Sequence, residues 1–509
     1  MSKRAQQTEA AFRLGQQLHM AGRFQEAERI YRQVVAAAPR QAEVVHALGA
    51  LLLQTGRPDA ADEMVRRAIG LRPAAEFQLT RANILLALGC PADAAECARL
   101  AAKARPGDAA AHQVLGHALA DSLDAHGAID AYEQALRLSP SLPDLRNNLG
   151  TAFRLAGRLE EAERELRLAP PDPGSLVNLS SVQKERGNFA DAEATLRRAL
   201  AMAPQDPVLL YNWSLLMNLL GRPDEAWAGW EQRFRAGAVP MRSFGKAEWS
   251  GEPLQGRTLL VHSEQGMGDV IQFARYVPAL EGSVVLEAPK RLVRLLSSNP
   301  EMPPLTPDDR PMPRFDAVVP LLSLPVRTRA QPRTPPYLFA EAERIALWRD
   351  RIGTDGLRIG IAWQGFSGRH EDKGRSVPLA RFAPLAEVPG VRLISLQKGE
   401  GEEQIATAPF ALETLTDLDA GPDAFIDTAA VMTVIDLVIT SDTSVAHLAG
   451  ALGRPVWVAL RKVPDWRWLL DRSDSSWYPS MRLFRQATDG DWGLVFRAMA
   501  ERLLAGNVP

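Results

Sequence analysis

The sequence has very few cysteines, no long apolar run and almost no net charge. Cys90 and Cys97 are the only cysteines among 509 residues, too few for a disulfide scaffold or a cysteine-based metal site. Lysine plus arginine (59) nearly cancels aspartate plus glutamate (61), so the net charge gives no indication of nucleic-acid binding. No stretch resembles a membrane span or a signal peptide. These absences predict a cytoplasmic protein with no integral membrane segment and no nucleic-acid partner.

The composition and length are those of a multidomain globular protein. Apolar residues make up 46% of the chain and charged residues 24%, which excludes a disordered chain. Because 509 residues exceed what one hydrophobic core usually supports, we expect two or three domains.

A turn-and-helix phrase recurs through the first half of the chain. GRFQEAERIY, which begins at Gly22, returns as GRPDAADEMV, GCPADAAECA, GRLEEAEREL, GNFADAEATL and GRPDEAWAGW, and another copy keeps AIDAYEQALRLSP without the glycine. The alanine inside each phrase recurs in steps of 34, 33, 34, 34, 30 and 34 residues, at Ala27, Ala61, Ala94, Ala128, Ala162, Ala192 and Ala226. This period resembles the tetratricopeptide repeat.

Each repeat predicts two short helices that cannot bury their apolar faces alone. The glycine ends the first helix in a left-handed conformation, and the alanine lets the second helix approach its neighbours closely. A proline then closes the repeat, because proline cannot continue a helix. We therefore predict an all-α superhelix of about seven repeats over residues 1–235, with a shortened fifth repeat at the 30-residue step.

The last three repeats carry an asparagine nine residues before the turn: Asn148, Asn178 and Asn212. A carboxamide both donates and accepts, so it can pair with a peptide backbone whatever the side chains are. The arrangement resembles the asparagine ladder of O-linked N-acetylglucosamine transferases, which implies binding of a protein or peptide acceptor. The alternative is that these asparagines serve the packing of the repeats themselves.

After about Arg235, strand–helix alternation replaces the helical repeats. A linker over residues 236–256 is rich in glycine, proline and serine. TLLVH, SVVLE and DAVVP predict a parallel sheet within residues 257–340, and RIGIAW, VRLISLQ, LVITS and PVWVAL predict a second within residues 341–509. The prediction is an α/β half with two Rossmann-like lobes, the glycosyltransferase B-type (GT-B) architecture. Other paired Rossmann-like proteins share this periodicity, so motifs must separate them.

The first motif, HSEQGMGDVIQFARYVPAL, joins a strand end, a glycine loop and a helix start. Gly266 and Gly268 allow close backbone approach to a ligand, and Asp269 lies at the carboxyl edge of the sheet, where α/β proteins bind ligands. The motif resembles the Gly-Asp…Pro element of bacterial heptosyltransferases (glycosyltransferase family nine), with Pro278 as the helix proline. That resemblance implies that Asp269 is the general base. The alternative is a helix cap worth about 1 kcal/mol.

The second motif, DLVITSDTSVAHLAGALGRPVWVAL, places hydroxyl groups and free N–H groups at a helix N-terminus. Such an end binds anions and suits the diphosphate of a nucleotide sugar. It resembles the family's Asp-Thr-Gly-x-x-His pattern through Asp442, Thr443, Ser444 and His447, with serine in place of the usual glycine. We predict donor binding by these four residues; His447 could instead be a helix histidine satisfied by the protein.

A basic segment, WQGFSGRHEDKGRSVPL, gathers Arg369, His370, Lys373 and Arg375. The family has a basic residue three positions before a proline, which selects Arg375. Arginine and lysine can stabilise a departing diphosphate, and Lys398 is a second candidate. The glycines between Gln364 and Pro378 predict a loop that closes over substrate. The alternative is a solvated basic loop.

The C-terminal segment is rich in aromatic residues: Trp466, Trp468, Trp477, Tyr478 and Trp492. Aromatics beside arginines can stack on a base or a sugar. We favour a core role, with this segment crossing back onto the first lobe.

The combination implies a metal-independent glycosyltransferase that uses a nucleotide-sugar substrate and no cofactor, since neither the two glycosyltransferase-like motifs nor the basic segment contains a DxD-type metal motif. Tetratricopeptide repeats joined to a GT-B transferase also resemble bacterial flagellin-modifying transferases. The acceptor would be a protein bound by the repeats. Residues 257–340 would form the acceptor lobe, and residues 341–509 would bind the nucleotide-sugar donor. A fragment that begins near Phe244 is then expected to keep donor binding. Two alternatives stay open: a lipopolysaccharide or other glycan acceptor, and a non-catalytic scaffold with a decayed transferase half.

Overall fold

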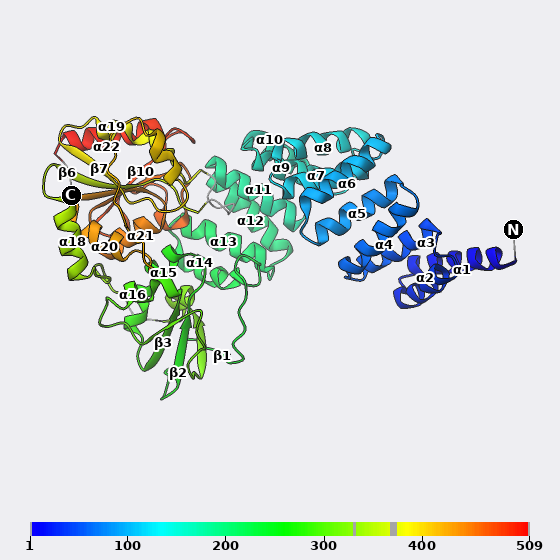
Figure 1. Ribbon diagram of the computed structural model, residues 1–509, viewed down its shortest axis with the longest axis horizontal. Helices are drawn as coiled ribbons and strands as arrows, with labels where there is room; N and C mark the ends of the chain where they lie inside the picture. The colour runs from blue at the N-terminus through cyan, green and yellow to red at the C-terminus, as the bar shows by residue number, and fades with distance from the viewer. Residues whose placement is uncertain (1–2, 329–331, 367–373, 507–509) are drawn as a thin grey trace. The chain divides into compact units, whose positions relative to one another are not determined.

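The computed structural model describes residues 3–328, 332–366 and 374–506, and the chain divides into two compact units, 1–203 and 204–509. The first unit is helical, and the second contains one more helix pair followed by two β-sheets (Figure 1). An all-α array followed by an α/β region with parallel sheets is what the sequence predicts.

Fourteen helices form seven antiparallel pairs, as predicted from the repeats. In the first unit they are α1 (Lys3–Met20), α2 (Phe24–Ala37), α3 (Ala42–Gln54), α4 (Pro58–Leu71), α5 (Ala75–Ala87), α6 (Pro91–Ala104), α7 (Ala109–Asp121), α8 (Ala125–Leu138), α9 (Leu145–Leu155), α10 (Leu159–Leu168), α11 (Pro173–Arg186) and α12 (Phe189–Met202). The second unit begins with α13 (Pro207–Leu219) and α14 (Pro223–Trp230). The fifth repeat is shortened as expected, because α10 has 10 residues where α8 and α12 have 14.

The turn glycines and the small alanines act as the repeat pattern predicts. Six glycines take φ between +71° and +86°: Gly22, Gly56, Gly89, Gly157, Gly187 and Gly221. The alanine five residues later is fully buried in every repeat, so the second helix of each pair approaches its neighbours without a larger side chain between them.

Leu123 occupies the turn position of the fourth repeat, where the other repeats have glycine. Its φ is +62° and 64% of the residue is exposed. A left-handed conformation costs a residue with a Cβ about 1–2 kcal/mol. Replacement by glycine removes this cost, but part of the gain is lost because glycine has more conformational entropy in the unfolded chain. Leu123→Gly is therefore expected to raise the free energy of unfolding by about 0.5–1 kcal/mol in urea denaturation. Leu123→Ala keeps the Cβ and serves as the control; a glycine variant no more stable than this control would contradict the account.

The rest of the second unit, in its described residues, is built on two parallel five-stranded sheets. The first sheet has the order β1-β5-β2-β3-β4, with β1 (Ala247–Glu248), β2 (Thr258–His262), β3 (Ser283–Ala288), β4 (Leu305–Pro307) and β5 (Ala317–Pro320). The second has the order β10-β9-β8-β6-β7, with β6 (Leu357–Ala362), β7 (Val391–Ser395), β8 (Leu437–Ser441), β9 (Val456–Leu460) and β10 (Met481–Arg485). Strands β1, β4 and β10 were not predicted from the sequence, and β1 lies in the segment predicted to be a linker.

The helices that matter for the site follow the central strand of each sheet. Helix α15 (Met267–Phe273) follows β2, and α21 (Ser444–Ala451) follows β8. Both helices therefore begin at the carboxyl edge of a parallel sheet. The remaining α-helices are α16 (Val293–Leu296), α17 (Leu324–Arg327), α18 (Ala342–Ile352), α19 (Ala383–Ala386), α20 (Ile426–Val434) and α22 (Trp492–Leu504).

The last repeat is part of the α/β unit. The indole N–H of Trp230, at the end of α14, donates to the carbonyl of Leu322 at 3.0 Å. Arg233 is fully buried and donates to both carboxylate oxygens of Glu264, at 2.6 and 3.0 Å, and to the hydroxyl of Ser323 at 2.8 Å. A fragment that begins near Phe244 would lack this arginine and leave Glu264 without its ion-pair partner. This contact argues against the expectation that such a fragment keeps donor binding.

Candidate functional site

Asp269 lies in the first turn of α15, as the glycine motif predicts. Its Oδ2 accepts a hydrogen bond from the backbone N–H of Gly266 at 2.9 Å, which caps the helix. Its Oδ1 lies 2.5 Å from a guanidinium nitrogen of Arg467, and the Asp269 side chain is 20% exposed. Capping is thus observed, and it leaves part of the carboxylate accessible; the general-base role stays a prediction.

The two glycosyltransferase-like motifs meet where α15 packs against α21 (Figure 1). A Cβ added to Gly268 would lie 3.0 Å from the Cδ2 atom of His447 and 3.3 Å from the Cα atom of Ser444. A side chain at this position would force the two helix ends apart, so the second glycine of GMGD allows this contact. The structure therefore brings Gly268 and Asp269 close to the first turn of α21, the helix that follows Asp442 and Thr443.

Arg467 makes a charged contact between the C-terminal aromatic segment and α15. It lies in the 3-10 turn η8 (Trp466–Trp468) beyond β9, and its side chain is only 9% exposed. Besides Asp269, it donates to Oε1 of Gln272 at 2.7 Å and to Oδ1 of Asp465 at 2.9 Å. Burial alone would lower the pKa of Arg467, but Asp465 and Asp269 beside it raise the pKa above its ordinary value.

The turn before α21 combines a buried carboxylate with hydroxyl groups. Burial raises the pKa of Asp442, and the nearby charge of Asp465 raises it further, while Arg375 acts in the opposite direction. Thr443 is the N-cap of α21, and its hydroxyl lies 3.2 Å from that of Thr440.

Arg375 approaches the same turn, as the donor-site prediction requires. A Cβ added to Gly365 would lie 3.5 Å from the Cγ2 atom of Thr443 and 4.0 Å from Nη2 of Arg375. Arg369, His370 and Lys373, with the rest of residues 367–373 of the predicted closing loop, lie outside the described residues.

His447 is packed inside the protein. Its Nδ1 lies 3.0 Å from the hydroxyl of Tyr478, its ring stacks on Trp468 at 5.4 Å between centroids, and the residue is 6% exposed. Burial, reinforced by the charge of Arg467, lowers the pKa of His447 to about 3, so the ring is neutral at physiological pH. These contacts fit a histidine satisfied by the protein; contact with a ligand stays a prediction.

Lys398 is exposed beyond the end of β7. Its neighbour Gln397 is buried and accepts hydrogen bonds from the backbone N–H groups of Trp363 and Gln364, at 2.9 and 3.0 Å. The glutamine thereby fixes the loop after β6, while the role of Lys398 in donor binding stays a prediction.

The three asparagines of the repeats are half-buried, and each amide nitrogen has a partner within the array. Asn148 contacts Nε2 of His117 at 2.9 Å, Asn178 donates to Oδ1 of Asn147 at 2.9 Å, and Asn212 donates to the carbonyl of Val208 at 2.9 Å. The first two bonds join adjacent repeats and favour the packing interpretation. Acceptor binding by these asparagines stays a prediction.

The C-terminal aromatic segment is core, as favoured. Trp466, Trp468, Tyr478 and Trp492 are buried, and Trp477 is partly buried. The segment also contacts the first lobe, because Arg275 donates to the carbonyl of Trp477 at 2.8 Å and Arg467 contacts α15. Arg467 was not among the predicted site residues, since only its position between Trp466 and Trp468 in the sequence indicates a buried arginine.

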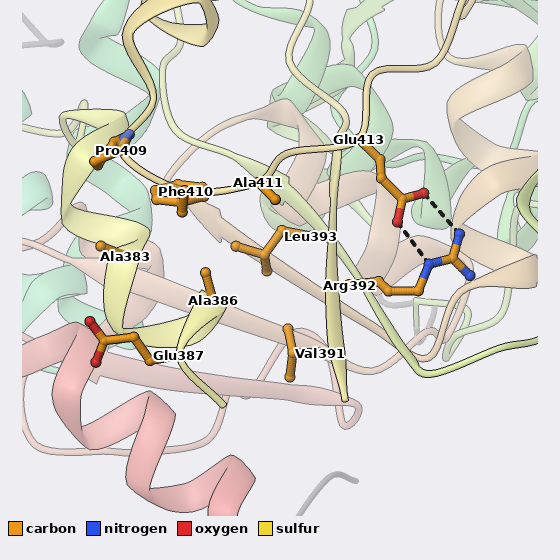
Figure 2. A pocket seen from close by; sticks show the side chains of 10 residues that line it. All are labelled: Ala383, Ala386, Glu387, Val391, Arg392, Leu393, Pro409, Phe410, Ala411 and Glu413. Atoms are coloured by element: carbon orange, nitrogen blue, oxygen red, sulfur yellow. Dashed lines mark hydrogen bonds and ion pairs between the residues drawn. The ribbon is translucent and has the colours of Figure 1, made fainter. Parts of the chain in front are cut away.

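A surface pocket lies elsewhere, beside β7. Figure 2 shows Leu393 and Phe410 along it and the ion pair of Arg392 with Glu413, whose atoms lie 2.7 Å apart, at one end. The predicted site residues do not line this pocket. In the described part of the chain, no cluster of His, Cys, Asp or Glu is arranged to hold a metal ion. Nor does any described helix have the length and apolar character needed to cross a membrane.

Comparisons with known proteins identify the first half. Tetratricopeptide-repeat models match residues 18–84, 114–175 and 178–239, so the chain contains tetratricopeptide repeats. The chain is also similar to Protein FlbA of Caulobacter vibrioides, with 27% identity over 92% of this chain and 80% of that protein. Among solved structures it is similar to MamA, with 21% identity, a TM-score of 0.30, and coverage of 36% of this chain and 94% of that one. A tetratricopeptide repeat protein from Parabacteroides merdae has 14% identity, a TM-score of 0.41, and coverage of 47% and 95%.

Proposed function

We propose that the chain is a GT-B glycosyltransferase that moves a sugar from a nucleotide-sugar donor to a protein bound by its repeats. The observation that carries this proposal is the contact of Gly268 with Ser444 and His447. Two motifs that resemble family nine transferases, far apart in the sequence, come together at the carboxyl edges of two parallel sheets. That edge is where α/β proteins bind their ligands.

In the proposed reaction, Asp269 accepts the proton of the acceptor group as that group attacks the donor sugar. The partly exposed carboxylate is held by the Gly266 N–H and by Arg467, so its orientation is fixed before substrate binds. The N-terminus of α21, with Thr443 and Ser444, and the guanidinium of Arg375 would stabilise the negative charge that develops on the leaving nucleoside diphosphate.

The repeats support a protein acceptor. Tetratricopeptide arrays present extended surfaces suited to peptides and proteins. The first unit has its own hydrophobic core, with Tyr31, Leu48, Val65 and Phe77 among its buried residues, so it can present such a surface as a folded body.

The donor site predicts a specific binding defect. Arg375→Ala and Thr443→Ala are each expected to weaken binding of the matching nucleoside diphosphate by about tenfold or more, because a charge-assisted hydrogen bond is worth roughly 1.5–3 kcal/mol. The measurement is calorimetry with uridine, guanosine and adenosine diphosphates. Arg472→Ala, which removes an arginine paired with Asp474 on the surface, is the control and should bind as the wild type does.

Removal of divalent metal ions by EDTA tests whether the reaction needs a metal. Activity in the presence of EDTA is expected to equal activity without it. Activity that EDTA abolishes and a divalent ion restores would contradict metal independence, and unchanged binding by both site variants would remove the proposed donor site.

A further inference from the structure

Arg467 comes from the second lobe but bonds to the first turns of a first-lobe helix. Its three guanidinium nitrogens have three different partners: Nε bonds to Gln272, Nη1 to Asp465 and Nη2 to Asp269. Gln272 and Asp269 are three residues apart on α15 and therefore lie on the same side of the helix. One planar side chain thus fixes both the rotation of α15 and the orientation of the Asp269 carboxylate.

We propose that Arg467 is a positioning residue that holds the Asp269 carboxylate in the orientation needed to take the acceptor's proton. The inference rests on the proposed transferase function. It assigns a role to a residue outside both glycosyltransferase-like motifs.

The charges around Arg467 define what its loss would do. Asp269 on α15 and Asp465 beside the 3-10 turn contact Arg467 directly, and Asp442 before α21 interacts with its charge. Arg375 is a further cation near Asp442, Arg275 lies within electrostatic range of His447, and His447 is neutral. Without Arg467, three carboxylates share a partly buried region with one fewer cation. Their mutual repulsion would then displace the Asp269 carboxylate from the orientation that Arg467 gives it.

The test compares Arg467→Gln, Arg467→Lys and the surface control Arg472→Gln in the full chain, with UDP-, GDP- and ADP-sugars as probes. For Arg467→Gln we expect kcat to fall about 10- to 100-fold, as for a misplaced catalytic group, with KM for the nucleotide sugar within about threefold.

Arg467→Lys separates charge from geometry. Lysine keeps the positive charge but lacks the planar fork. Its kcat should therefore be no lower than that of Arg467→Gln, but still about tenfold below the wild type. Arg472→Gln should match the wild type in both measurements. If Arg467→Gln does not fold, Arg467→Lys decides the question by its kcat.

Two outcomes would overturn the inference. One is wild-type kcat in a folded Arg467 variant, and the other is a loss of nucleotide-sugar affinity in Arg467→Gln as large as its loss of kcat. A wild-type chain that neither binds nor consumes any nucleotide sugar would instead overturn the transferase proposal itself, so the two failures are distinguishable.

Discussion

Asp269→Asn is expected to lower the rate of sugar transfer by about two to four orders of magnitude, the usual contribution of a general base. The one amide oxygen can keep the hydrogen bond from Gly266, so α15 keeps its cap. Arg467 loses its bond to residue 269 but still bonds to Gln272, which holds the helix in place. The amide cannot take up the acceptor's proton. Turnover is measured with the nucleotide sugar that the wild type consumes, and donor affinity is measured by calorimetry on the same preparation.

The matched control is Asp474→Asn, which changes a surface aspartate paired with Arg472. It should retain wild-type turnover. Near wild-type transfer by folded Asp269→Asn would exclude the aspartate from the chemistry and leave it as a helix cap. A loss of donor binding equal to the loss of rate would assign it to the donor site.

A chain beginning at Phe244 is expected not to fold, whereas a chain beginning at Pro204 is expected to fold and to bind nucleoside diphosphate. The shorter fragment lacks Arg233 and leaves the buried Glu264 without the cation that contacts both of its carboxylate oxygens. Removing one partner of a buried ion pair costs about 3–5 kcal/mol, a large share of a typical stability of about 5–15 kcal/mol. Trp466 also loses Trp227 and Trp230, whose ring centroids lie 6.2 and 5.4 Å away.

Circular dichroism melting of both fragments checks this prediction. Arg233→Met in the full chain is the companion variant; it should lower the melting temperature without changing the repeats of the first unit. A cooperative melting transition together with nucleotide binding by the fragment that begins at Phe244 would contradict the account.

The repeats could be predicted from the sequence because their information is local. The turn glycine, the buried alanine and the closing proline lie within one helix pair, and the period repeats them. Even Leu123 falls at the expected position and takes the left-handed conformation of the missing glycine. The fact that the last repeat belongs to the second unit was not predictable, because it depends on contacts of Trp230 and Arg233 with residues distant in sequence.

The site could be predicted only in its separate parts. The sequence identified the Gly-Asp turn and the Asp-Thr-Ser turn, each as a strand end followed by a helix. Their contact through Gly268 depends on the packing of two lobes, which no local pattern contains. Arg467 was missed for the same reason, since its partners Asp269 and Gln272 come from another lobe. Strands β1 and β4 were missed because two or three residues are too few to show alternation.

The central claim is nucleotide-sugar transfer, and nucleoside diphosphate release tests it most directly. The full-length chain and Asp269→Asn are incubated with UDP-, GDP- and ADP-sugars together with protein extract as acceptor, and the free diphosphate is quantified. We predict that the wild type releases diphosphate from at least one donor and that Asp269→Asn releases it about 100-fold more slowly. Equal release by the two proteins, or none from any donor by the wild type, would contradict this account.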